Sequence, residues 1–160
     1  MILEVKKVIN TEIKDFLDRA KIPIRLSVLT ESGWPIILSL WFSYTNDGKF
    51  LLATPEKAKV VNLLRKNPKC AFEISNEEAP YCGIRGQAKA RILESKGIEV
   101  LEMLLQRYIV DGKNSPLGQK LLTRKIKEVA IEVSPTNIFS WNFKNRMKDS
   151  GAIKPQLTCP

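Results

Sequence analysis

Residues 53–63, ATPEKAKVVNL, decide the fold expected for this chain. They begin at the last residue of an apolar run at residues 50–53, so the pattern predicts a strand that passes directly into a helix. Thr54 suits the N-cap position and Pro55 the first helical position. The helix is expected to end near Asn67, because a proline follows.

The start of this helix is also the best candidate for a binding site. Unpaired backbone N–H groups and the positive end of the helix dipole favour an anion there. The Thr54 hydroxyl, Lys57 and Lys59 add donors and positive charge to the same small region. Together they predict a phosphate site. The alternative is an ordinary solvated helix start that carries two lysines.

Working outward, the chain alternates strand-like runs with a few helices. Asn10 or Thr11 can cap a first helix, and Asp47-Gly48 marks a tight hairpin. Further helices are expected at residues 94–110 and near 119–124. Strands are expected at residues 24–30, 35–45, 50–53, 69–75, 81–93, 127–133 and 137–141. This order favours a mainly β fold, an antiparallel barrel with helices packed outside it.

Length and composition set the broad class. The 160 residues suit one domain, expected over residues 1–147 with a C-terminal tail at 148–160, and hydrophobic residues make up 44%. No apolar run reaches membrane-span length, and the N-terminus has no signal-peptide pattern, so a cytoplasmic protein is expected. The net charge of +9 favours an anionic partner such as a phosphorylated cofactor, an acidic substrate, a nucleic acid or a membrane surface.

Histidine and cysteine usage narrows the chemistry. The chain has no histidine, which removes His-based catalytic pairs and His-ligated metals. Its three cysteines, Cys70, Cys82 and Cys159, are far apart in the sequence and form no CxxC, which argues against a disulfide framework or a zinc site. An enzyme of this composition is expected to take its chemistry from a cofactor.

Five motifs in sequence order resemble a known family. They are GWP at 33–35, SLWF at 39–42, DGKFLLAT at 47–54, KAKVVNLLRKNP at 57–68 and GIRGQA at 83–88. Within them, the pattern K-x-x-N-L-x-x-x-N-P at residues 59–68 is the most specific. The order resembles the pyridoxamine 5'-phosphate oxidase-like family over residues 24–143. The resemblance implies an FMN-binding split β-barrel that forms a homodimer, with FMN at the subunit interface.

The resemblance also implies which residues contact the cofactor. A strand at Ser39, Leu40 and Trp41 would run along the isoalloxazine, largely through backbone groups. The phosphate would lie at Thr54, Lys57 and Lys59. Two aromatic residues from later strands would approach the flavin, namely Tyr81 and Trp141.

Several of these residues have structural alternatives. Trp41 can be barrel core, with only its backbone on the cofactor. Trp141 and Tyr81 can each belong to core packing or to the cofactor pocket. Arg25 could reach an anionic ligand, but a surface salt bridge explains it better.

The chain departs from the named oxidase, because its strand at residues 38–42 is apolar where that oxidase is basic. It also lacks that oxidase's C-terminal Arg-Leu ending with catalytic His. The expected function is therefore an FMN-dependent oxidoreductase that passes electrons from a reduced nicotinamide or deazaflavin to a small organic acceptor. A non-catalytic flavin- or haem-binding module is the alternative, and deazaflavin F420 or haem could replace FMN. A nucleic-acid role ranks last, since no stacking aromatic series or recognisable motif accompanies the charge.

Overall fold

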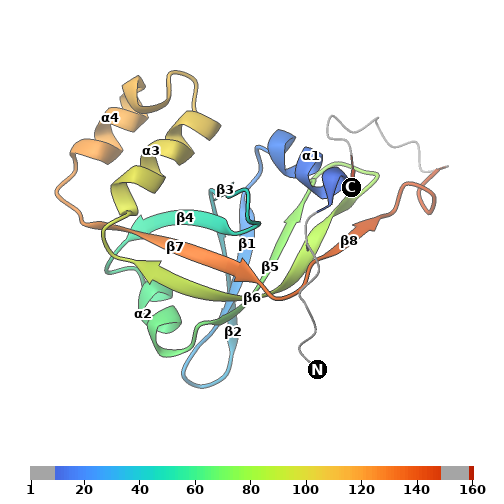
Figure 1. The fold of residues 1–160 in the computed structure, drawn as a ribbon, viewed down its shortest axis with the longest axis horizontal. Coiled ribbons are helices and arrows are strands. Elements are labelled where there is room, and N and C mark those ends of the chain that lie inside the picture. Colours follow the sequence, from blue (N-terminus) through green and yellow to red (C-terminus); the bar gives the residue numbers. More distant parts are fainter. Residues whose placement is uncertain (1–9, 149–158) are drawn as a thin grey trace.

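The computed structural model describes residues 10–148 and 159–160 and has a mainly β architecture with flanking helices (Figure 1). In that part of the chain, no helix is long and apolar enough to cross a bilayer. The helical elements are α1 (Thr11–Arg19), α2 (Lys59–Lys66), α3 (Gly97–Tyr108), the 3-10 helix η1 (Gly112–Asn114) and α4 (Pro116–Thr123). The strands are β1 (Ile24–Leu29), β2 (Pro35–Leu40), β3 (Ser43–Tyr44), β4 (Phe50–Pro55), β5 (Lys69–Ser75), β6 (Cys82–Leu93), β7 (Glu128–Pro135) and β8 (Phe139–Asn142).

The strands form one antiparallel sheet that curls into a barrel. The order is β2-β1-β5-β6-β7-β4-β3, and β8 pairs with the first half of β6. Its two outer strands, β2 and β3, are consecutive in sequence and separated only by Trp41 and Phe42. Trp41 and Phe42 therefore connect the two outer strands of the sheet. The barrel is closed at these two residues and open farther along β2.

One large core fills the barrel, and a smaller one lies outside it. Alternate residues of β1 and β4 point inward, and Phe42, Phe50 and Phe72 are buried at the centre. The apolar sides of α1 and α2 pack against this core. In contrast, α3 covers the outer side of β4 and β7, where Val100 and Leu104 bury Ala130 (Figure 1).

Several sequence expectations are confirmed. Asn10 caps α1 by accepting from the backbone N–H of Ile13 at 2.8 Å. The hairpin after β3 turns through Gly48, which has a φ of 85°. The strand expected at residues 69–75 has the same limits in the structure.

Two local expectations are wrong. The strand expected at residues 35–45 is interrupted at Trp41 and Phe42, because its two halves pair with different neighbours, β1 and β4. The helix expected from Thr54 starts at Lys59, with Ala58 as its N-cap. Pairing with β7 extends β4 as far as Pro55, and a residue held in a ladder cannot also cap a helix.

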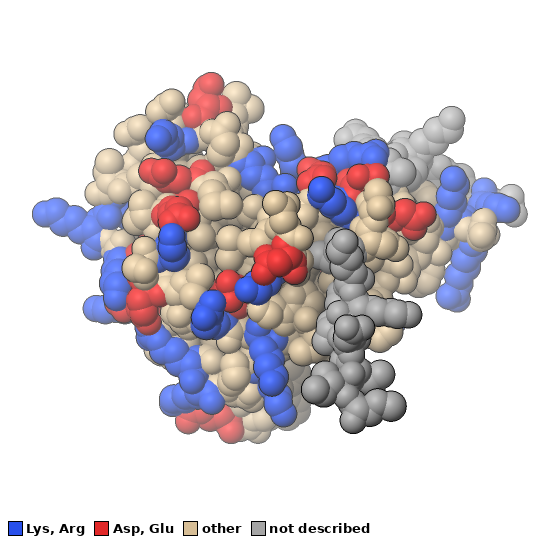
Figure 2. Space-filling view, in the orientation of Figure 1, with Lys and Arg blue, Asp and Glu red and all other residues tan. Residues whose placement is uncertain are grey.

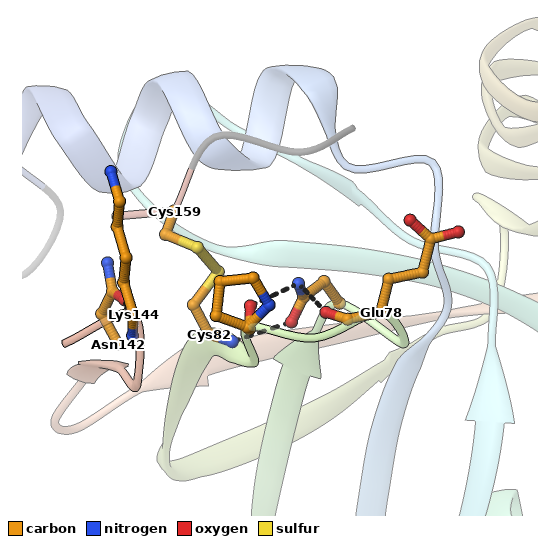
Figure 3. The surroundings of a disulfide bond; sticks show 7 residues. Glu78, Cys82, Asn142, Lys144 and Cys159 are labelled. Atoms are coloured by element: carbon orange, nitrogen blue, oxygen red, sulfur yellow. Dashed lines mark hydrogen bonds between the residues drawn. A yellow bond between two sulfur atoms is a disulfide. The ribbon is translucent and has the colours of Figure 1, made fainter. Parts of the chain in front are cut away.

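The expectation about cysteine is also wrong. Cys82 and Cys159 form a disulfide across 77 residues of sequence, while Cys70 is free and buried. Cys159 reaches the start of β6 with Asn142 and Lys144 to one side and Glu78 to the other (Figure 3). Spacing along the chain could not show this, because only the folded sheet brings the start of β6 to the C-terminal residues. The rest of the expected tail, residues 149–158, and the N-terminal residues 1–9 lie outside the described residues.

Candidate functional site

The candidate site is the split of the barrel, which we define as the opening between β2 and the second half of β4. Beyond Ser43 and Tyr44, which pair with β4, the chain leaves β4 and continues back as β2, which pairs with β1. In the described part of the chain, residues 52–55 of β4 pair only with β7. Each side of the split therefore presents a strand edge with backbone groups that no other strand uses.

Two of the segments expected to contact the cofactor border this split. Ser39 and Leu40 end β2, and Trp41 is the next residue. On the other side, Thr54 lies in β4 and is buried, with 7% of its surface exposed. The strands β2 and β4 diverge from Trp41 and Phe42, which we call the vertex. The structure thus brings together two motifs that are separate in the sequence.

The side chain of Trp41 turns away from the split. Its ring stacks on that of Tyr108 in α3, with 5.1 Å between centroids and 7° between planes. It packs against the small cluster under α3. With its ring held against Tyr108, Trp41 can offer its backbone to a ligand in the split, and the backbone contact expected from the sequence stays a prediction.

The start of α2 follows directly from the β4 side of the split. Ala58 is the N-cap and has no side chain that could accept a hydrogen bond from the first turn. Lys59 opens the helix, and Lys57 lies two residues before it; both side chains are exposed. An uncapped helix start with two adjacent lysines retains the properties that favour an anion. Thr54, as a buried strand residue, is not the cap that the sequence suggested.

Ion pairs around α2 leave these two lysines available. Lys127 pairs with Glu56 at 2.6 Å, and Arg65 pairs with Glu94 at 2.6 Å. Hydrogen bonds from Arg65 and then Lys127 hold the pKa of Glu94 below its usual value, and Glu56 and Glu94 raise the pKa of Lys127. Among the ion pairs found in the described residues, none involves Lys57 or Lys59.

Tyr81 and Trp141 lie elsewhere in the sheet. Tyr81 immediately precedes β6, its carbonyl accepts from the Phe143 N–H at 2.9 Å, and Trp141 pairs with Gly83. From Ser39, the row of paired residues passes through β1, β5 and β6 before it reaches β8. Four strand spacings of about 4.8 Å therefore separate the split from Trp141 within one chain.

The outward face of this row carries a feature that the sequence did not single out. A groove with a volume of about 550 Å³ crosses β1, β2, β5 and β6. Ile37 and Phe139 line it and are exposed to 73% and 60%. Glu73 and Arg85 also line it, from paired positions on β5 and β6. The period-two alternation of these strands was the signal that could have identified these outward residues.

Arg25 lines the same groove, and its expected role as a salt-bridge residue is confirmed. Its guanidinium lies 3.0 Å from Glu77 and 3.9 Å from Glu73. It also donates to the Ser75 hydroxyl at 3.2 Å. These partners fix its side chain in the lining of the groove.

The architecture defines the fold of the protein. A curled antiparallel sheet, joined at a vertex and split beyond it, with helices at its ends, is the split barrel of the pyridoxamine 5'-phosphate oxidase-like proteins. Comparison with solved structures supports this assignment. No protein-family model matches the sequence, and no curated protein matches it either.

Three solved structures illustrate the likeness. Conserved hypothetical protein Rv2991 from Mycobacterium tuberculosis is 17% identical, with a TM-score of 0.69 over 97% of this chain and 95% of that one. An F420 reductase is 20% identical, with a TM-score of 0.62 over 82% and 98%. HutZ, the haem storage protein from Vibrio cholerae, is 17% identical, with a TM-score of 0.63 over 80% and 91%. At these identities, the likeness establishes the fold.

Proposed function

We propose that this protein binds FMN, with the phosphate at the start of α2 and the isoalloxazine in the split. One observation carries the proposal: two unpaired strand edges diverge from the vertex, and one of them leads directly into an uncapped helix start with Lys57 and Lys59. The cation pair suits a phosphate, and the strand edges offer N–H and C=O groups to the polar edge of a flavin.

The chemistry proposed is electron transfer to a small organic acceptor from a reduced nicotinamide or deazaflavin. Bound FMN would supply the redox chemistry. The chain supplies binding and orientation through the lysines and the strand edges. Because it has no histidine, any proton for the acceptor must come from water, a tyrosine, a lysine or the flavin itself.

We also infer a homodimer, for two reasons. Tyr81 and Trp141 are expected to approach the flavin but lie four strands along the sheet from the split of their own chain, which favours contact with a cofactor in the split of a second copy. The face of the sheet that carries the groove, which we call the groove face, lies between the split and Trp141. It has exposed apolar side chains, including Ile37 and Phe139. A two-fold pairing of this face would bury those side chains and complete each site with residues of the partner.

Two neighbours of this fold carry names that point to other cofactors, deazaflavin F420 and haem. F420 shares a phosphate with FMN, so the same helix start would suit it. Haem fits less well, because the usual histidine ligand is not available in this sequence. A nucleic-acid role also has little support: on the face shown in Figure 2, acidic side chains are interspersed among the lysines and arginines.

A titration with FMN and riboflavin tests the binding proposal. FMN should bind at least tenfold more tightly at moderate salt, because only FMN carries the phosphate. Equal dissociation constants would reject the phosphate site. A Soret band in the purified protein, in place of a flavin spectrum, would favour the haem-binding alternative.

Turnover needs a separate experiment. Under anaerobic conditions, NADH, NADPH or reduced F420 should bleach the flavin band, and a quinone should restore it. If dithionite bleaches the band and none of these donors does, the protein is a flavin-binding module without turnover.

A further inference from the structure

The vertex of the split is held by the last turn of α3. Tyr108 lies parallel to Trp41, and its hydroxyl accepts a hydrogen bond from the backbone N–H of Phe42 at 3.3 Å. The same hydroxyl donates to the carbonyl of Ile22 at 2.9 Å. Tyr108 thus connects the vertex to the segment that leads into β1.

The neighbouring residue ties the same place to α1. Arg107 donates to the carbonyls of Leu17 and Ala20, the latter at 2.8 Å. Its guanidinium lies 5.1 Å from the centroid of the Phe42 ring. Because α1 and α3 are both anchored in this way, the vertex has little freedom to move relative to either helix.

The hydrogen bond to Phe42 has a directional consequence. The Phe42 N–H and the Trp41 carbonyl belong to one planar trans peptide, so they point in opposite directions. With the N–H directed at Tyr108, the Trp41 carbonyl points away from α3. Phe42 is fully buried, so without the hydroxyl its N–H would lose its partner in a place shielded from water.

We propose that Tyr108 is a positioning residue for the cofactor, whose hydroxyl sets the peptide between Trp41 and Phe42 and thereby the direction of the backbone carbonyl that Trp41 offers to the split. This inference rests on the proposed function, because it assigns that carbonyl to the isoalloxazine. Tyr108 itself acts through the backbone and does not contact the cofactor.

Tyr108→Phe tests the inference, because it keeps the ring that stacks on Trp41 and removes only the hydroxyl. The matched control is Tyr44→Phe. Tyr44 lies in β3, past the vertex on the paired side, and its hydroxyl donates to Asp18. Both variants lose one tyrosine hydroxyl near α1, but only one of the two hydroxyls touches the peptide at the vertex.

Three quantities are measured for each variant: the FMN dissociation constant, the visible spectrum of bound FMN, and backbone amide exchange at residues 40–42 without FMN. We expect Tyr108→Phe to weaken FMN binding roughly fivefold to tenfold, to shift the flavin absorption bands and to accelerate exchange at Phe42. Tyr44→Phe should leave all three unchanged. Unchanged affinity and spectrum in Tyr108→Phe, or equal losses in both variants, would overturn the inference.

The exchange measurement separates this inference from the proposed function. If the wild-type protein does not bind FMN, the proposed function fails. Faster exchange at Phe42 in Tyr108→Phe would still support a vertex set by the hydroxyl, and unchanged exchange would refute it.

Discussion

At the scale of single residues, Lys59 and Lys66 differ in what they contact, although both belong to α2. Lys59 opens the helix, and Lys66 is its last residue and forms an ion pair with Glu31. That pair lowers the pKa of Glu31, chiefly through its hydrogen bond with Lys66. General attraction between a basic protein and an anionic ligand would use both lysines, whereas a phosphate site at the helix start would use only the first.

We therefore predict that Lys59→Ala weakens FMN binding roughly tenfold or more, because it removes a charge-assisted hydrogen bond to the phosphate. Lys66→Ala should change the dissociation constant less than twofold. The measurement is a fluorescence titration at two salt concentrations. Similar losses in the two variants would point to general charge attraction.

Cys70 provides a second prediction at this scale. Burial raises the pKa of its thiol to about 11, so at pH 8 only about one molecule in a thousand carries the thiolate. Iodoacetamide should therefore leave the native protein unmodified. Mass spectrometry should find one label after unfolding without reductant and three labels after unfolding with it, as Cys82 and Cys159 are paired. In the native protein, a label on Cys70 would contradict its burial, and a label on Cys82 or Cys159 would contradict the disulfide.

At the scale of elements, the connection between β5 and β6 determines where Tyr81 lies. The side chain of Asn76 closes this connection: its amide donates to the carbonyls of Glu78 and Pro80 and its oxygen accepts from the Cys82 N–H at 2.7 Å. Asn76 is 9% exposed, so these bonds are largely shielded from water. One side chain thus orders the loop that leads to Tyr81, a residue that would contribute to the site of the second copy in the proposed dimer.

We predict that Asn76→Ala lowers the free energy of unfolding by about 2–4 kcal/mol, because several buried backbone groups lose their partner. Asn114→Ala, at an exposed position in η1, should cost less than about 0.5 kcal/mol. Urea denaturation of both variants measures the difference. Equal stability of the two would show that the side chain of Asn76 does not order the loop.

At the scale of the whole molecule, the proposed homodimer depends on burial of the groove face between two copies. We predict that Ile37→Glu gives a monomer at micromolar concentration, because a carboxylate would be buried without a partner in the interface. The same variant should lose FMN affinity, since each site would lack Tyr81 and Trp141 of the second copy. Val110→Glu is the control, because Val110 is 85% exposed beyond the end of α3 and away from this face. Sedimentation velocity distinguishes the outcomes, and a monomeric wild type with full flavin occupancy would contradict the dimer.

The disulfide acts at the same scale, because it links the C-terminal residues to the start of β6. Closing a loop of 77 residues restricts the unfolded chain, so Cys159→Ser should lower stability by about 2–4 kcal/mol. Reductant should lower the melting temperature of the wild type to that of the variant and leave the variant unchanged. Identical melting of all four samples would refute the pairing. Thiols are normally kept reduced in the cytosol, so an oxidised Cys82 in cells would count against the cytoplasmic location expected from the sequence.

The sequence by itself determined the mainly β class, most of the strands and the lysine-rich segment after β4. These depend on local signals: alternation of apolar residues, turn residues such as Asp47-Gly48, and the order of five short motifs. Local signals did not predict where α2 begins, because pairing with β7 keeps Thr54 and Pro55 in a strand.

Only the tertiary structure decided the remaining features. The break at the vertex depends on the pairing of β2 with β1 and of β3 with β4, and the hydrogen bond that the vertex makes comes from Tyr108, 66 residues away in the sequence. The disulfide joins residues 77 positions apart, and the distance from Tyr81 and Trp141 to the split depends on the order of strands in the sheet. Each of these contacts is set by how the sheet curls and which strands become neighbours, a choice made by packing of the whole core that no short stretch of sequence records.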